Sequence, residues 1–315
     1  MRRLCCVCLL LADPFFCLPS LTLYAQGSNN STQIFTLAIR DQQGRFVTDI
    51  QANQIVISGQ GVSVQRLELD NAPRRIVLLL DTSGSMGDYR SFSWSNVAHV
   101  AIQIALQRKG NDLIGLETFA EKEQILVPLT MDSQLLVKHI EALTSSGRGR
   151  TMMGLALREI LSRRENGLRF GDAMILVSDG DRSLEDKTDF AQLGDDLIRA
   201  GVRICLIRVQ PMMGFGATSG VSDASDFVAD VGGIKLNMYS PLEEVHPGDA
   251  AQVDPKMIES TAQAAYDFVR TYYRVGVEIS EPLQRPRQLR LRLVDQQRSM
   301  KRLQLNYPRY LLPVQ

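Results

Sequence analysis

The feature that most constrains the fold of this chain is a run of five apolar residues, Ile76 to Leu80, that leads directly into Asp81. A short, continuous apolar run indicates a strand that is buried on both faces, as in a parallel sheet covered by helices. The loop that follows brings a carboxylate at Asp81 and hydroxyls at Ser83 and Ser85 to the carboxyl end of this strand. Open α/β sheets bind their ligands at that edge. Such hard oxygen donors suit Mg²⁺, Mn²⁺ or Ca²⁺ better than Zn²⁺.

Strand and helix patterns alternate through residues 74–240, which we take as one domain. Helical segments with apolar residues at three-and-four spacing separate the apolar runs. This alternation predicts an α/β fold with a doubly wound, mostly parallel, Rossmann-like sheet and helices on both faces. Asp254 and the proline after it indicate a further helix over 254–273, because aspartate caps helices well and proline suits the first helical position. The predicted strands are Ile76–Leu80, Leu113–Phe119, an antiparallel edge at Gln124–Leu129, Met174–Ser178 and Ile204–Val209.

Alternating apolar residues, typical of half-buried strands, occur on both sides of this domain. They define an N-terminal β segment over residues 33–70 and a C-terminal β segment over residues 274–310. Neither segment is long enough to bury its apolar face alone. We therefore predict that the two pair with each other in a small β-sandwich that flanks the central domain.

Residues 1–25 have the composition of a secretory signal peptide. Arg2 and Arg3 precede an apolar stretch, and the small residue Ala25 provides a cleavage site before Gln26. Asp13 and the proline after it interrupt the apolar stretch and argue against a stable transmembrane span. We expect export to the periplasm, the cell surface or the medium, with an uncleaved membrane anchor as the alternative.

The charge balance argues against nucleic-acid binding, and the cysteine content argues against disulfides and cysteine metal clusters. The 35 basic and 35 acidic side chains cancel, and a chain without net positive charge gives no support for nucleic-acid binding. Four of the five cysteines lie within the signal segment, so cleavage would leave only Cys205. One cysteine can form neither an internal disulfide nor a cysteine metal cluster. Cys205 lies in an apolar run and is expected in the core.

The Asp-Thr-Ser-Gly-Ser loop resembles the first part of the metal-ion-dependent adhesion site (MIDAS) of a von Willebrand factor type A (VWA) domain. That resemblance implies a threonine from a second loop and an aspartate after another buried strand. Both occur in order, since Thr151 follows Gly149-Arg150 and Asp179 follows the apolar run that ends at Ser178. The metal site implied by the resemblance consists of Asp81, Ser83, Ser85, Thr151 and Asp179.

The same resemblance implies how these residues act. The three hydroxyls contact the ion directly when a ligand is bound, and the two aspartates act mainly through water molecules. Neutral hydroxyls leave the cation strongly electrophilic, so an aspartate or glutamate carboxylate from a partner protein fills the open position. Mg²⁺ fits best because it favours octahedral oxygen ligands and retains water, with Mn²⁺ and Ca²⁺ as alternatives. Ser83 and Ser85 could instead only cap a helix, but that leaves Thr151 and Asp179 without explanation.

A wider resemblance extends over residues 34 to 310. The order of segments is similar to that of the bacterial VWFA-related proteins described from Acidobacteria. It consists of an opening strand followed by Asp41–Asp49, then a VWA domain, and then the tyrosine-rich segment Tyr272–Gly276. This resemblance implies a bacterial protein with flanking β segments, and it implies no defined biochemical role.

We therefore predict an exported, metal-dependent protein-binding or cell-adhesion module rather than an enzyme. Three alternatives stay open: a hydrolase that uses Asp81 and Asp179 around a divalent ion, a structural scaffold whose metal site is unused, and a cytoplasmic chaperone-like adaptor. Ser83 stands where a hydrolase nucleophile elbow needs its first glycine, and the sequence contains no Gly-Lys phosphate-binding loop. Arg148 and Arg150, in the second loop, could steer an acidic partner toward the site.

Overall fold

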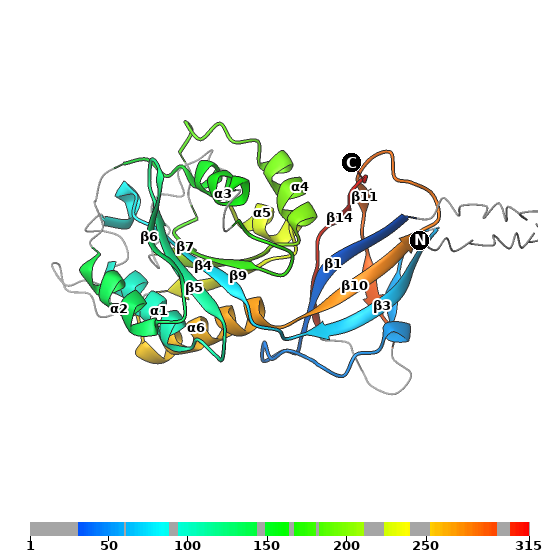
Figure 1. Ribbon diagram of the computed structural model, residues 1–315, viewed down its shortest axis with the longest axis horizontal. Helices are drawn as coiled ribbons and strands as arrows, with labels where there is room; N and C mark the ends of the chain where they lie inside the picture. Colours follow the sequence, from blue (N-terminus) through cyan, green and yellow to red (C-terminus); the bar gives the residue numbers. More distant parts are fainter. Residues whose placement is uncertain are drawn as a thin grey trace, which may run out of the picture.

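The computed structural model describes most of the chain between residues 31 and 314 (Figure 1). The predicted signal peptide over residues 1–25 lies outside the described residues. Within the described part, no helix is both long enough and apolar enough to span a membrane. The described ranges are 31–59, 61–87, 94–143, 149–163, 167–180, 183–210, 224–239, 253–294 and 303–314.

The central sheet has six strands in the order β6-β5-β4-β7-β8-β9. Every neighbouring pair is parallel except β5 and β6, so β6 is the antiparallel edge that the sequence predicts. The five apolar residues of β4 are at most 3% exposed, because helices cover both faces of the sheet. The strands are β4 (Arg75–Asp81), β5 (Leu113–Phe119), β6 (Glu123–Thr130), β7 (Ala173–Ser178), β8 (Arg203–Gln210) and β9 (Ile234–Tyr239).

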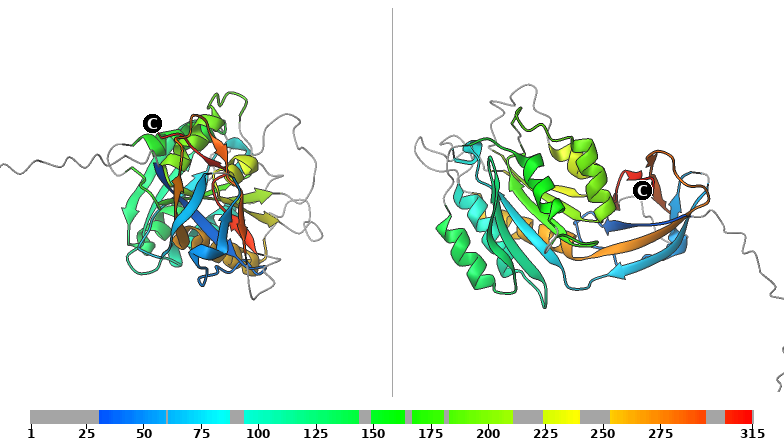
Figure 2. Two further views of the ribbon diagram at one scale, coloured as in Figure 1. Left: turned by 90° about the vertical axis from the view of Figure 1, so that its right-hand side faces the viewer. Right: turned by 45° about the horizontal axis from the view of Figure 1, so that its top comes forward.

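Helices pack on both faces of this sheet, as the second view of Figure 2 shows. Successive residues of a strand point to opposite faces. Leu78 therefore packs in the apolar cluster with α1, α2 and α6, and Leu79 packs in the cluster with α3, α4 and α5. This arrangement confirms the predicted doubly wound α/β fold class. The helices are α1 (Trp94–Leu106), α2 (Ser133–Ala142), α3 (Met153–Ser162), α4 (Phe190–Ala200), α5 (Ala224–Asp230) and α6 (Pro255–Arg270).

Local sequence signals fix the ends of two of these helices. The carboxylate of Asp254 accepts a hydrogen bond from the N–H of Lys256, and proline occupies the first turn, as predicted for α6. Asp189 caps α4 in the same way. Gly201 ends α4 with φ of 62°, a left-handed conformation that glycine adopts readily.

Strands from both parts of the chain outside the central domain form the flanking β region (Figure 1). One antiparallel sheet has the order β13-β1-β10-β3, and β2 pairs with β12. A common apolar cluster includes Phe35, Leu37, Val275 and Leu311. The two β segments thus bury their apolar faces together. The elements are β1 (Ser31–Arg40), the 3-10 turn η1 (Ala52–Gln54), β2 (Ile55–Ile57), β3 (Val62–Asp70), β10 (Tyr272–Ile279), β11 (Arg287–Gln288), β12 (Leu291–Leu293), β13 (Gln304–Asn306) and β14 (Tyr310–Leu311).

A buried polar network joins the flanking region to the central domain. Arg74, just before β4, forms an ion pair of 2.5 Å with Asp70 at the end of β3. The hydroxyl of Tyr272 donates to the same carboxylate at 2.9 Å.

Arg203 of β8 lies over the ring of Phe268, with its guanidinium carbon 4.1 Å from the ring centroid. Burial lowers the pKa of Arg203 to about 9, and the contact with an aromatic face compensates part of the cost of burying its charge.

Candidate metal centre

Three loops meet at the carboxyl edge of the central sheet. β4 ends at Asp81 and continues into the 3-10 turn η2 (Gly84–Gly87). β7 pairs with β4 in parallel and ends at Ser178, so the two strands bring Asp81 and Asp179 close together. The third loop leads into α3 and carries Thr151. The fold therefore gathers residues that are about a hundred positions apart in the chain.

Asp81 is fully buried at the base of this centre. Its Oδ2 accepts a hydrogen bond of 2.7 Å from the hydroxyl of Ser178. Its Oδ1 accepts one of 2.9 Å from the backbone N–H of Ser83. The hydroxyl oxygen of Ser178 also lies 3.5 Å from Oδ1 of Asp179, so this serine lies between the two carboxylates.

The predicted hydroxyl ligands lie together above Asp81. Oγ1 of Thr151 donates to Oγ of Ser83 at 2.9 Å, and Oγ of Ser83 lies 3.3 Å from Oγ of Ser85. Ser83 is buried, whereas Ser85 is exposed, so this row of hydroxyls reaches from the interior to the surface. The N–H of Gly84 donates to the carbonyl of Gly149 at 3.0 Å, which holds the two loops together.

Burial, together with the nearby carboxylate of Asp179, raises the pKa of Asp81 to about 7. Two carboxylates in a poorly solvated place repel each other, and a divalent cation relieves that repulsion. Among the described residues, no group of three His, Cys, Asp or Glu side chains could hold a metal ion. The hydroxyls of Ser83, Ser85 and Thr151 supply three further oxygen atoms at this centre. Carboxylate and hydroxyl oxygens fit a hard divalent cation.

Residues 76–181 match the sequence model of the von Willebrand factor type A domain family. This part of the chain is a VWA domain. A curated relative, an uncharacterized protein of Borreliella burgdorferi, is 27% identical over 127 residues, which are 39% of this chain and 37% of the relative. The match thus spans less than two fifths of that protein. VWA domains commonly mediate protein interactions, and many depend on a metal ion.

Solved structures similar to this chain include three proteins with low sequence identity. An aerotolerance-related membrane protein from Bacteroides fragilis NCTC 9343 is 15% identical, with a TM-score of 0.44 over 62% of this chain and 98% of that one. Proximal thread matrix protein 1 from the mussel byssus is 13% identical, with a TM-score of 0.48 over 67% of this chain and 50% of that one. The manganese-loaded TRAP protein of Plasmodium vivax is 14% identical, with a TM-score of 0.41 over 77% of this chain and 96% of that one.

The structure of the VWA domain also shows positioning residues that the sequence analysis did not identify. Ser178 closes the apolar run of β7, and a hydroxyl at the end of a buried strand was a usable signal. Ser183 and Asp186 follow in a polar loop that carries no distinguishing pattern. The N–H of Thr151 donates to Oγ of Ser183 at 3.0 Å, and the carbonyl of Thr151 accepts from the N–H of Ser183 at 3.0 Å. Asp186 accepts a hydrogen bond of 2.6 Å from the N–H of Gly154. The loop after β7 thereby holds the threonine loop in place.

Other residues near the VWA metal centre have structural explanations. Arg150 lies 3.9 Å from Glu185 and both side chains are more than half exposed, so this pair is solvated and contributes little to stability. Trp94 donates from its indole nitrogen to the carbonyl of Leu143 at 3.0 Å and links α1 to the end of α2. Arg148 lies outside the described residues.

Proposed function

We propose that this chain is an exported, metal-dependent protein-binding module whose VWA domain uses its MIDAS. The ion is held by the hydroxyls of Ser83, Ser85 and Thr151, with Asp81 and Asp179 acting through water molecules. A bound Mg²⁺ supplies a Lewis-acidic position that an Asp or Glu carboxylate of a partner protein can complete.

The observation that carries this proposal is the convergence of side-chain oxygens from three separate loops. The 2.9 Å contact between Thr151 and Ser83 joins residues that lie 68 positions apart. Capping of a helix by Ser83 would not require this contact. The carboxylate of Asp81 lies in the interior, whereas the hydroxyl of Ser85 lies at the surface, so neutral ligands face an approaching partner.

The donor set favours Mg²⁺. Hydroxyls and water-mediated carboxylates leave several positions for water, and Mg²⁺ gives up its water reluctantly. Ca²⁺ prefers more direct carboxylate and carbonyl ligands at longer distances, and Mn²⁺ accepts a similar oxygen set. A ranking of Mg²⁺ and Mn²⁺ above Ca²⁺ in a competition titration would agree with this assignment, and a ranking with Ca²⁺ first would contradict it.

Peptide selection in the presence and absence of the ion tests the proposed binding function. Random peptides displayed on phage are selected against the chain in buffer with Mg²⁺, and elution with EDTA recovers the metal-dependent binders. We expect an enrichment of Asp or Glu, and loss of binding when that residue becomes Asn or Gln. Thr151→Val removes one ligand hydroxyl at nearly constant volume and should abolish binding. Ser260→Ala, on the exposed face of α6, serves as the matched control.

Three results would favour other functions. Turnover of ester or phosphoester substrates that EDTA stops and Asp81→Asn abolishes would indicate a hydrolase. Binding of Mg²⁺ without enrichment of carboxylate peptides would indicate a scaffold with an unused site. An intact N-terminus on protein recovered from the cytosol would indicate the cytoplasmic adaptor.

The proposal of export rests on the signal-like composition of residues 1–25. N-terminal sequencing of the protein from fractionated cells tests it. A new terminus at Gln26 in the exported fraction is expected, whereas an intact terminus in the membrane fraction would indicate an uncleaved anchor.

A further inference from the structure

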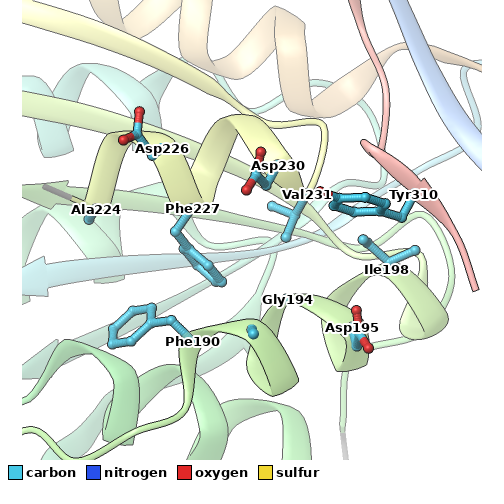
Figure 3. A pocket seen from close by; sticks show the side chains of 11 residues that line it. Phe190, Gly194, Asp195, Ile198, Ala224, Asp226, Phe227, Asp230, Val231 and Tyr310 are labelled. Atoms are coloured by element: carbon cyan, nitrogen blue, oxygen red, sulfur yellow. The ribbon is translucent and has the colours of Figure 1, made fainter. Parts of the chain in front are cut away.

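A groove lies between α4 and α5 on the face of the central sheet that α6 does not cover (Figure 3). It has a volume of about 390 Å³ and is closed at one end by Tyr310 of β14. Phe190 and Phe227 contact each other edge to face at the other end, with ring centroids 5.1 Å apart. Gly194 has no side chain to fill the centre of the groove. The lining is thus aromatic at both ends and open between them.

A second cavity of about 250 Å³ continues this groove toward the flanking β region. The two share Ile198 and Tyr310 in their walls. Ile34 and Val314 line the second cavity and are 51% and 69% exposed, which is unusual for large apolar side chains. A continuous apolar path therefore extends from the helices of the VWA domain to β1. Contiguous exposed apolar surface of this kind marks an interaction site.

The rim of the groove is acidic. Asp195 of α4 and Asp226 of α5 line it from opposite walls, as Figure 3 shows. The two helices and the residue before β14 carry four aspartates and two arginines, namely Asp195, Asp196, Asp226, Asp230, Arg199 and Arg309. Arg199 lies 3.7 Å from Asp196, and Arg309 lies 2.8 Å from Asp230, so both arginines are paired with rim or neighbouring carboxylates. These six side chains together carry a net negative charge.

We propose that this groove is a docking site for a segment of a partner protein in which an apolar side chain is flanked by lysine or arginine. The apolar floor accommodates the anchor, and pockets of this size typically enclose one or a few large side chains. The carboxylates of Asp195 and Asp226 are complementary to the flanking cations. None of the predicted metal ligands lines this groove, so docking here requires no metal ion.

The test uses random nonapeptides displayed on phage and selected against the whole chain in the presence of EDTA. We expect enrichment of peptides that combine Phe, Trp or Leu with neighbouring Lys or Arg. An enriched peptide is then labelled, and its affinity is measured by fluorescence anisotropy at low ionic strength. EDTA removes divalent ions, so this selection does not depend on the proposed metal site. A failed peptide selection would therefore not count against the metal site, and a failed metal titration would not count against the groove.

Two variants and one control locate the binding site. Ala191→Trp places a large ring into the groove from an exposed helix position and should abolish binding. The double variant Asp195→Asn and Asp226→Asn should weaken binding on the order of tenfold, with the loss reduced by added salt. The matched double variant Glu141→Gln and Glu259→Gln removes the same charge from exposed positions elsewhere and should leave the affinity unchanged. Circular dichroism confirms that each variant is folded.

Three results would overturn the proposal. These are selection without enrichment, enrichment of acidic peptides, and binding that survives Ala191→Trp in a folded protein. Analytical ultracentrifugation tests whether a second copy of this chain, instead of a partner protein, occupies the groove. A wild-type dimer that Ala191→Trp dissociates would assign the groove to self-association instead of to a basic partner.

Discussion

Replacement of Asp81 by asparagine should remove a specific pH dependence from the stability of the metal-free protein. The ordinary pKa of this carboxyl is 3.8, and in the folded metal-free protein it is about 7. The folded state therefore binds the proton more tightly than the unfolded chain does. It follows that the free energy of unfolding falls as the pH rises from about 4 to about 7, and levels off above that pH.

The size of this effect follows from the difference in pKa. The complete loss is about 4 kcal/mol, of which about 2.5 kcal/mol falls between pH 5 and pH 8. Asparagine keeps the shape of the side chain and can still accept the hydrogen bond from the N–H of Ser83, but it carries no titrating proton. The variant should therefore lack this component of the pH dependence.

Urea unfolding of wild type and Asp81→Asn in EDTA, at pH 5 and pH 8, measures the difference directly. Subtracting the unfolding free energies of the two proteins cancels the contributions of titrating groups that do not interact with Asp81; Asp179, which does interact with it, contributes to the remaining difference. Parallel pH profiles would refute the reasoning, because they would show that Asp81 has the same pKa in both states. Addition of Mg²⁺ should stabilise wild type more at pH 8 than at pH 5 and should not change the variant.

Three further substitutions test other parts of the structure. Tyr273→Phe removes a hydroxyl that donates to one backbone carbonyl at 3.0 Å and accepts from one backbone N–H at 3.1 Å. It should lower the free energy of unfolding by about 1–3 kcal/mol, measured by thermal or urea unfolding. Gly232→Ala should destabilise by about 2 kcal/mol or more in the same assay, because φ is 81° and the new Cβ would lie 2.5 Å from the backbone of Tyr307. Ser183→Ala removes the hydroxyl that holds the N–H of Thr151 and should weaken Mg²⁺ binding about tenfold in a calorimetric titration, with unfolding little changed.

Much of the central domain could be predicted from sequence because its buried strands are apolar on both faces. The run in β4 is an example, since only a strand between two helical layers buries every side chain from Ile76 to Leu80. The helix capped by Asp254 was predictable because its capping signal is local. In the same way, each loop of the metal centre follows an apolar run or a small-residue turn that the sequence displays.

Other features depend on contacts that have no local signal. The Ser183 loop positions Thr151 through backbone and hydroxyl contacts across 32 residues, and a polar loop gives no indication of its neighbours. The acidic groove arises because α4 and α5 leave Gly194 opposite Phe227, and Tyr310 arrives there from β14. Each of these elements has an ordinary amphipathic or β pattern when considered alone. Only the tertiary arrangement brings their apolar residues into one surface.

The most direct test of the central claim is an isothermal titration of the chain with Mg²⁺, beside the same titration of Asp81→Ala. We predict saturable binding of one ion to wild type and none to the variant. Saturable binding of equal affinity to both proteins would contradict it, because the ion would then be held somewhere other than the oxygens gathered around Asp81.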